Sequence, residues 1–292
     1  MPSTPRSGQL KMGAKSKIEW TDATWNPVTG CSKVSAGCKN CYAEGVAKRF
    51  WADRKFTDIE THFEILGKPL NWRNPKRIFV NSMSDLFHER VPFKFIDDVF
   101  TTMYLAKHHT FQILTKRPER MLEYIQGRTF QAMSAAGKPA LVLPNVWLGV
   151  SVEDQESADE RIPLLIQTPA AVRFLSAEPL LGKLDINGYL KCKLPGVDMK
   201  KLYPANEAGI GWVICGGESG AAARPFDIRW GHFLRDQCQA AGVPFFMKQF
   251  GSKPFESPKH AGATGCELVL ENRNGVDMKE WPADLRVRQF PK

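Results

Sequence analysis

The stretch Val146-Trp-Leu-Gly-Val150 is a short apolar run that is followed by the polar residues Ser151 and Glu153. From residue 154 to residue 167 comes a segment with the apolar spacing of an amphipathic helix. A continuous apolar run of this length is typical of a parallel strand that is buried on both faces. The stretch therefore predicts one strand followed by one helix.

The same pattern of an apolar run with a polar end recurs along the chain, at residues 77–81, 111–115, 172–176, 212–215 and 244–248. Helical spacing also occupies residues 96–103 and 229–241, and Gly242 is a stop signal for the latter. With a first strand near residues 18–20, the alternation predicts an α/β fold: a full or partial TIM-type (β/α) barrel with parallel strands. A doubly wound open sheet is the alternative, because the pattern does not settle strand order.

Polar residues follow these runs at the points where the strands should end. The carboxyl ends of parallel strands meet at one edge, and ligands bind there. We therefore expect a ligand-binding mouth formed by Ser82 to Asp85, Thr115, Lys116, Arg117, Ser151, Glu153, Ser176, Glu178, Glu218, Ser219, Lys248 and Gln249. For Asp85 and Ser151 the alternative is that they only cap the following helix. A lysine is no N-cap, and each glutamate follows an apolar run, so binding is favoured for these residues.

Three cysteines near the N-terminus, Cys31, Cys38 and Cys41, form a C-x6-C-x2-C cluster. The segment around them is rich in Gly, Ser and Lys and has no apolar period that would bury the thiols. Soft thiolates at this spacing indicate a metal site. A closed zinc site needs four ligands, whereas a [4Fe-4S] cluster on three cysteines leaves one iron open. The remaining cysteines are scattered singly and are expected to be small buried hydrophobes: Cys192, Cys215, Cys238 and Cys266.

Two other interpretations of the cluster are a disulfide and a zinc site. The seven cysteines are an odd number and no secretory segment precedes them, which disfavours disulfides. Zinc, with a histidine or a distant cysteine as fourth ligand, remains the alternative metal, because the half formed by Cys38 and Cys41 is as typical of zinc as of iron.

The strings Asn26-Pro27, Gly30-Cys31 and Cys41-Tyr42-Ala43 resemble the cluster loop of radical S-adenosylmethionine enzymes, in particular of the spore photoproduct lyase-like subgroup. The usual spacing there is C-x3-C-x2-C, and this chain has three more residues between Cys31 and Cys38. Nearly the whole chain also resembles a phage-associated family of three-cysteine-motif proteins without an established reaction. The matching stretches are residues 80–87, 114–118, 147–153, 175–180, 213–219 and 245–249.

The resemblance implies a [4Fe-4S] cluster on Cys31, Cys38 and Cys41, with S-adenosylmethionine and an external electron donor. It implies a 5′-deoxyadenosyl radical and an action on DNA, RNA or a nucleotide, in repair or modification. Ser82 and Asp85 would meet an ammonium and a ribose. The expected cofactor-binding residues are Tyr42, Ser82, Asp85, Lys116, Ser151, Glu178 and Glu218. The alternative function is a zinc- or cluster-stabilised nucleic-acid-binding protein without catalysis.

The composition predicts a soluble, cytoplasmic protein. The chain has 292 residues, 43% of them hydrophobic, and no apolar run reaches the ~18 residues that a membrane helix needs. A formal net charge of +9 permits a nucleic-acid partner. The expected phosphate contacts are the basic tail, Arg73, Lys76, Lys116 and Arg117.

The expected organisation has three parts. Residues 1–16 form a disordered basic tail, residues 17–251 a barrel-like domain with a cluster loop at 26–43, and residues 252–292 a C-terminal extension packed on the barrel. Residues 127–144 and 182–211 are expected to be long insertions.

Overall fold

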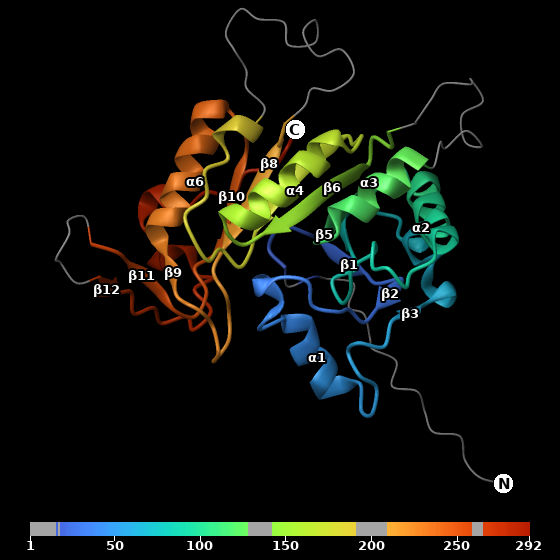
Figure 1. Cartoon of the computed structure of the whole chain (residues 1–292), viewed down its shortest axis with the longest axis horizontal. Helices are drawn as coiled ribbons and strands as arrows, with labels where there is room; N and C mark the ends of the chain where they lie inside the picture. Colours follow the sequence, from blue (N-terminus) through green and yellow to red (C-terminus); the bar gives the residue numbers. More distant parts are fainter. Residues whose placement is uncertain (1–15, 17, 128–141, 191–208, 259–264) are drawn as a thin grey trace, which may run out of the picture.

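The computed structural model describes residue 16 and residues 18–127, 142–190, 209–258 and 265–292. The basic tail predicted at residues 1–16 lies almost wholly outside the described residues, as do most of the two predicted insertions. Figure 1 shows the remaining chain as one curved sheet with helices along one side.

Seven parallel strands form the main sheet, in the order β1-β4-β5-β6-β7-β8-β10. Their bounds are β1 (Ala23–Trp25), β4 (Arg77–Val80), β5 (Thr110–Thr115), β6 (Val146–Val152), β7 (Val172–Ala177), β8 (Trp212–Gly216) and β10 (Phe245–Gln249). Each pair of neighbours is parallel. The order follows the chain without the reversal that defines a doubly wound sheet. The fold is therefore a partial TIM-type barrel, as predicted, with β1 and β10 as its two ends.

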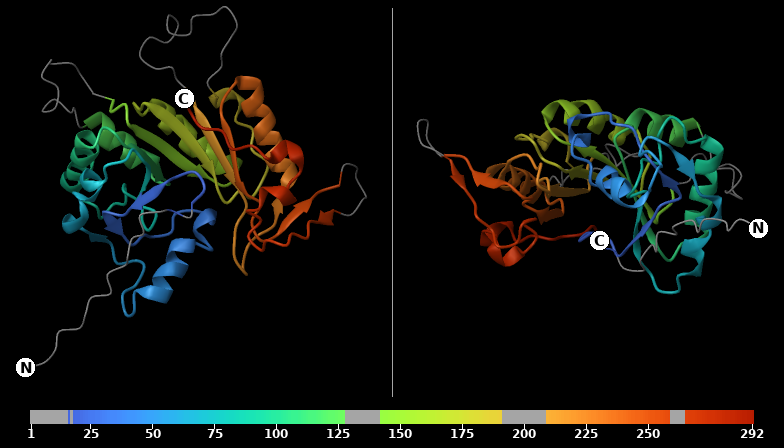
Figure 2. Two further views of the ribbon diagram at one scale, coloured as in Figure 1. Left: turned by 180° about the vertical axis from the view of Figure 1, so that it is seen from behind. Right: turned by 90° about the horizontal axis from the view of Figure 1, so that it is seen from below.

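In the described residues the α-helices are α1 (Tyr42–Phe50), α2 (Phe93–Leu105), α3 (Pro118–Gly127), α4 (Gln155–Gln167) and α6 (Ile228–Ala241). Figures 1 and 2 show α2, α3, α4 and α6 along one face of the sheet, whereas α1 stands apart from this layer. Asp154 begins α4 with a capping box, in which its side chain accepts from Ser157 N. Gly242 ends α6 at φ 66°, which confirms the predicted stop. No helix in the described part of the chain is long and apolar enough to cross a membrane.

The strands are apolar on both faces because both faces are covered. In β4, Ile78 belongs to the large core beneath the helices, whereas Phe79 belongs to a second cluster. That second cluster fills the inside of the curved sheet: Trp20, Phe79, Phe174, Trp212, Ile214 and Phe246. Position 149 is occupied by glycine, because a Cβ there would lie 2.6 Å from the Phe174 ring. This double burial explains the continuous apolar runs in the sequence.

Short elements complete the fold. Two small sheets consist of β2 (Val28–Thr29) with β3 (Glu60–Thr61), and of β9 (Phe226–Asp227), β11 (Pro254–Glu256) and β12 (Cys266–Glu267). The 3-10 turns in the part of the chain that the structure describes are η1 (Ala36–Cys38), η2 (Phe63–Ile65), η3 (Lys68–Asn71), η5 (Asn187–Tyr189), η6 (Met278–Glu280) and η7 (Ala283–Leu285).

The chain after Gly251 contacts the main sheet. Trp281 is buried and stacks on Phe250 with ring centroids 4.9 Å apart. Gln289 N donates to Phe245 O at 2.9 Å, beside the amino end of β10. Trp281 and Gln289 therefore cover β10, the last strand of the main sheet.

The first strand differs from its prediction. Residues 18–20 form a turn closed by Thr21 N, which donates to Ile18 O at 3.2 Å, and the strand itself is Ala23–Trp25. Trp20 instead places its side chain in the interior cluster. The apolar residues at 18 and 20 therefore serve to fill the curved sheet and not to pair with β4.

Candidate functional site

The three cysteines of the cluster lie on one loop that leads from β2 into α1. Gly30 N donates to Met83 O at 3.1 Å, just beyond the carboxyl end of β4. Only glycine fits at position 30, because its φ is +93° and a Cβ would lie 2.2 Å from Asp58 O. Cys41 is the N-cap residue of α1. The loop, residues 31–41, is called the cysteine loop below, and it starts at the carboxyl edge of the sheet.

Arg117, which follows β5, holds the beginning of the cysteine loop. Its side chain is 6% exposed, and its Nη2 donates to Ser32 Oγ at 2.9 Å. Its Nη1 lies 3.8 Å from Cys31 Sγ. Burial opposes the guanidinium charge, but Asp85 and Glu89 outweigh it and raise the pKa of Arg117. Burial and the nearby Asp85 raise the pKa of the Cys31 thiol to about 12.

Asp85 is fully engaged by protein donors. Its Oδ1 accepts from Thr115 Oγ1 at 2.8 Å and from Phe87 N at 3.0 Å. Its Oδ2 accepts from Lys116 N at 3.0 Å and from Arg117 Nη1 at 3.3 Å. A carboxylate has about four acceptor positions, so Asp85 holds the turn after β5. Cofactor binding by Asp85 stays a prediction.

Glu153, at the end of β6, is the most buried charge of the site, at 1% exposure. It accepts from Lys116 Nζ at 2.5 Å and from Arg161 Nη1 at 3.2 Å. Ser35 of the cysteine loop donates to it at 3.1 Å. The same Lys116 Nζ donates to Ser151 Oγ at 2.5 Å. Removing one partner of such a buried pair costs about 3–5 kcal/mol, because the other charge stays buried and unpaired.

Glu218, just after β8, binds the end of the cysteine loop. Its Oε2 accepts from Asn40 Nδ2 at 3.0 Å and from Arg224 Nε at 2.9 Å. Burial alone would raise its pKa, but the hydrogen bonds from Arg224 and Asn40 outweigh burial and lower the pKa of Glu218. Arg224 Nη1 also donates to Ala36 O at 2.9 Å.

A further ion pair, Glu178 with Lys248, joins the ends of β7 and β10. Lys248 Nζ lies 2.9 Å from Glu178 Oε1, and Ser176 Oγ donates to Glu178 Oε2 at 3.2 Å. The two charged side chains keep exposures of 14% and 22%. A Cβ at position 216 would lie 2.7 Å from Glu178 Oε1, so Gly216 leaves room for the Glu178 carboxylate in its present position. Ser151 Oγ donates to Glu178 O at 3.2 Å, which links this pair to Lys116.

Tyr42, the first residue of α1, turns its hydroxyl inward and donates it to the carbonyl of Ser82. Desolvation of this hydroxyl, with Cys41 nearby, raises the pKa of Tyr42, although 59% of the residue is exposed. Ser82 Oγ donates to Asn26 Oδ1 at 3.1 Å. Tyr42 and Ser82 therefore connect α1 to the end of β4.

The cysteine loop offers a donor set suited to a soft metal. Cys31, Cys38 and Cys41 are free and half-buried. Within the described ranges, no three His, Cys, Asp or Glu side chains are grouped closely enough to hold a metal ion. Three thiols on one loop still fit an iron–sulfur cluster or zinc by their chemistry. Binding requires the thiols to come closer together than they lie here.

The structure brings the predicted polar residues to one edge, as parallel strands require. Asn40, Arg161 and Arg224 were not predicted as site residues. Arg161 lies on α4, about two turns beyond the Asp154 cap, and its side chain reaches back to Glu153. Asn40 and Arg224 have no local signal, because their partners Glu218 and Ala222 reach Asn40 only in the folded chain.

The predicted phosphate contacts are not grouped at this edge. Arg117 is buried and Lys116 is paired with Glu153. Arg73 and Lys76 precede β4, so they lie near the amino end of that strand and not near the cysteine loop.

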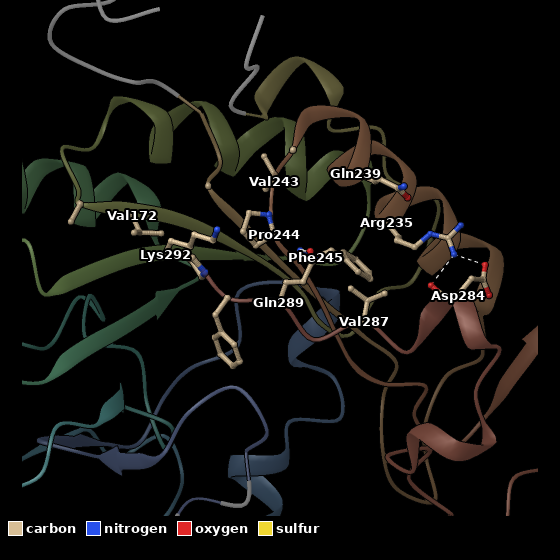
Figure 3. Close-up of a pocket in the computed structure, with 15 residues that line it drawn as sticks. Val172, Arg235, Gln239, Val243, Pro244, Phe245, Asp284, Val287, Gln289 and Lys292 are labelled. Carbon is tan, nitrogen blue, oxygen red and sulfur yellow. Dashed lines mark hydrogen bonds and ion pairs between the residues drawn. The ribbon is translucent and has the colours of Figure 1, made fainter. Parts of the chain in front are cut away.

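A cavity of about 1030 Å³ lies at the amino ends of β7, β8 and β10. Figure 3 shows its lining, in which Arg235 is paired with Asp284. Val172 and Phe245 begin their strands, so the cavity is at the opposite edge from Glu178 and Lys248. It is therefore separate from the candidate site.

Fold and site thus define a partial (β/α) barrel with a three-cysteine loop at its carboxyl edge. The chain belongs to the DUF5131 family of proteins of unknown function, whose model matches residues 15–277. No curated protein matches the sequence.

Solved structures of spore photoproduct lyase are similar in fold. The lyase complexed with dinucleoside spore photoproduct has a TM-score of 0.42 and 9% identity, covering 95% of this chain and 76% of that chain. A single-residue variant of the lyase has a TM-score of 0.43 and 10% identity, covering 96% and 76%.

Proposed function

We propose that this chain is an iron–sulfur enzyme of the radical S-adenosylmethionine type, in which Cys31, Cys38 and Cys41 hold one [4Fe-4S] cluster. The observation that carries the proposal is the place of the three free thiols, on one loop docked against the carboxyl ends of parallel strands. Ligands of parallel βα folds bind at this edge. Three cysteine ligands leave one iron open for a further ligand.

A bound cluster of this kind binds S-adenosylmethionine and, with an external electron donor, supplies a 5′-deoxyadenosyl radical. The residues that would contact the cofactor or substrate are those that keep exposure or unused hydrogen-bonding positions: Tyr42, Ser82, Lys116, Ser151, Glu178 and Lys248. Glu178 and Lys248 together offer both signs of charge to a ligand. Asp85 and Glu218 would act by holding the protein around it, because their oxygens are already occupied.

The first test is the metal content after anaerobic reconstitution with iron and sulfide. We expect about four iron atoms and about four sulfides per chain, and an electron paramagnetic resonance signal after reduction. Cys38→Ser should lose the iron, whereas Cys266→Ser, which alters an exposed cysteine outside the loop, should keep it. The reduced protein should release 5′-deoxyadenosine from S-adenosylmethionine. Stoichiometric zinc without iron uptake would contradict the proposal.

The substrate class that we propose is a nucleic acid or a nucleotide. The support is the number of exposed cations on the cysteine loop, in α1 and shortly after it, together with the exposed aromatic Phe50: Lys33, Lys39, Lys48, Arg49 and Lys55. Lys33 and Lys48 are paired with Glu44. Cations with an aromatic side chain fit phosphates and bases of a single strand. The same cations support the alternative function, a zinc- or cluster-stabilised nucleic-acid-binding protein without catalysis.

The second test is fluorescence anisotropy with a single-stranded oligonucleotide at two salt concentrations. Each of Lys39→Glu and Arg49→Glu should weaken binding and lower the salt slope by about 0.7 for each lost phosphate contact. Arg73→Glu makes the same charge change near the amino end of β4 and should leave binding unchanged. No binding at low salt would remove polymers as partners. Binding without iron uptake would favour the alternative.

A further inference from the structure

The middle of the cysteine loop contacts the sheet through three consecutive residues, Ser35, Ala36 and Gly37. Ser35 Oγ donates to Glu153 Oε1 at 3.1 Å, and Ala36 O accepts from Arg224 Nη1 at 2.9 Å. Gly37 packs so closely on Glu153 that a Cβ would lie 2.3 Å from Oε1 and 2.4 Å from Cγ. Real Cβ atoms do not approach other heavy atoms so closely. A side chain at position 37 would therefore force residues 35–37 and Glu153 apart.

Glu153 and Arg224, the two side chains that contact this segment, are each held by ion pairs with other residues. Glu153 is buried between Arg161, at 3.2 Å, and Lys116, at 2.5 Å. Arg224 forms a two-point pair with Glu218, through Nε at 2.9 Å and Nη2 at 2.7 Å. A paired fork of this kind has a defined orientation. Moving either side chain away from the loop would therefore break its ion pairs.

We infer that residues 35–37 are a docking segment, which fixes the cysteine loop on the sheet before any metal binds, and that Glu153 is its positioning residue. The segment has three residues, which is also the excess of this C-x6-C spacing over C-x3-C. The long spacing then supplies the contacts to Glu153 and Arg224, and Cys38 directly follows them. The role for metal binding rests on the proposed function, whereas the docking itself is a property of the metal-free protein.

The experiment is differential alkylation of the metal-free protein by iodoacetamide, followed by peptide mass spectrometry. In Gly37→Ala the added methyl group must displace the loop from Glu153, so Cys38 should react about tenfold faster than in the wild type. The matched control is Gly45→Ala in α1, where a Cβ meets nothing within 4 Å. This control should leave the rate at Cys38 unchanged. The exposed Cys266 is the internal reference.

Rescue separates positioning from general destabilisation. Glu153→Asp shortens the acid, so the variant combining Gly37→Ala with Glu153→Asp should protect Cys38 better than Gly37→Ala alone. If Gly37→Ala does not fold, Ser35→Ala removes the hydroxyl, which donates to Glu153 at 3.1 Å and lies 4.0 Å from Cys38 Sγ, and should still speed the reaction at Cys38. Equal rates at Cys38 in the wild type, Ser35→Ala and Gly37→Ala would overturn the inference. Failure of iron uptake would contradict the proposed function and leave these rates unaffected.

Discussion

Acidic residues that look alike in the sequence have different surroundings at the carboxyl edge. Glu153 is 1% exposed and neutralised by two cations, whereas Glu178 keeps 14% exposure and one cationic partner. A buried, fully paired carboxylate has no capacity left for a ligand. Glu178 is therefore the better candidate for contact with a bound molecule, and Glu153 the better candidate for holding the loop.

The buried His109 makes the stability of the protein depend on pH. It is 1% exposed, its Nδ1 accepts from Lys76 N at 3.2 Å, and its Nε2 donates to Pro69 O at 3.0 Å. Burial lowers the pKa of His109, and the neighbouring His108 and Lys76 lower it further. In the unfolded chain a histidine has a pKa of about 6.5. The unfolded state therefore binds the proton more readily, and stability falls as pH drops below this value.

We expect the urea midpoint of the wild type to be lower at about pH 5.5 than at about pH 7.5, with His109 contributing to the difference. His109→Asn removes the titrating ring, so it should reduce this pH dependence even if it lowers stability at both values. His108→Asn removes the exposed neighbour, whose effect on the pKa of His109 is smaller than that of burial, and should keep most of the wild-type dependence. If His109→Asn and the wild type show the same pH slope, the buried ring does not contribute as argued.

At the scale of elements, strand alternation decides what each side chain meets. In β8, Val213 and Cys215 pack in the core beneath the helices, whereas Trp212 and Ile214 fill the inside of the curve. A shift of one residue would exchange the two sets. The large aromatics of the inner cluster fit only the inside, where Gly149 leaves space for the Phe174 ring.

The cysteine loop shows the same dependence on its neighbours. Its residues lack an apolar period, and its 3-10 turn η1 has no side-chain cap. Its order comes from groups on three other segments, namely Arg117, Glu153 and Arg224. The loop is therefore an element whose conformation depends on tertiary contacts more than on its own propensity.

The whole molecule has two edges of different character. The cysteine loop and the ion pairs lie at the carboxyl edge. At the amino edge, apolar residues near the end of the chain cover the sheet. There, Phe290 lies with its ring centroid 5.5 Å from Trp212 and 5.2 Å from Phe246. Arg77 lies over the Phe290 ring at 4.0 Å. The last residues thus complete the inner cluster of the sheet.

We expect Phe290→Ala to lower the free energy of unfolding by about 1–3 kcal/mol, because it removes aromatic contacts to β8 and β10 and a cation above the ring. Val269→Ala truncates a side chain that is 92% exposed and should change stability by less than about 0.5 kcal/mol. Urea denaturation of both variants against the wild type measures the difference. Equal midpoints for Phe290→Ala and Val269→Ala would show that the end of the chain does not stabilise the sheet.

The sequence by itself determined the alternation of strands and helices. Strands buried on both faces must be apolar along their whole length, so local apolar runs predict six of the seven main strands. Gly242 likewise predicts the end of a helix. Because parallel strands share one direction, it also followed that the polar residues after the runs meet at one edge. The three-cysteine loop is likewise a local pattern.

Only the tertiary structure decided strand order, the place of the first strand and the partner of each charge. Ser35 and Glu153 are 118 residues apart, and Asn40 and Glu218 are 178 residues apart, so no local pattern relates them. Arg117 was expected to contact phosphate at the carboxyl edge, yet the fold buries it beside Cys31. The physical reason is that burial and pairing are properties of the space between elements, and that space exists only once the sheet has curved.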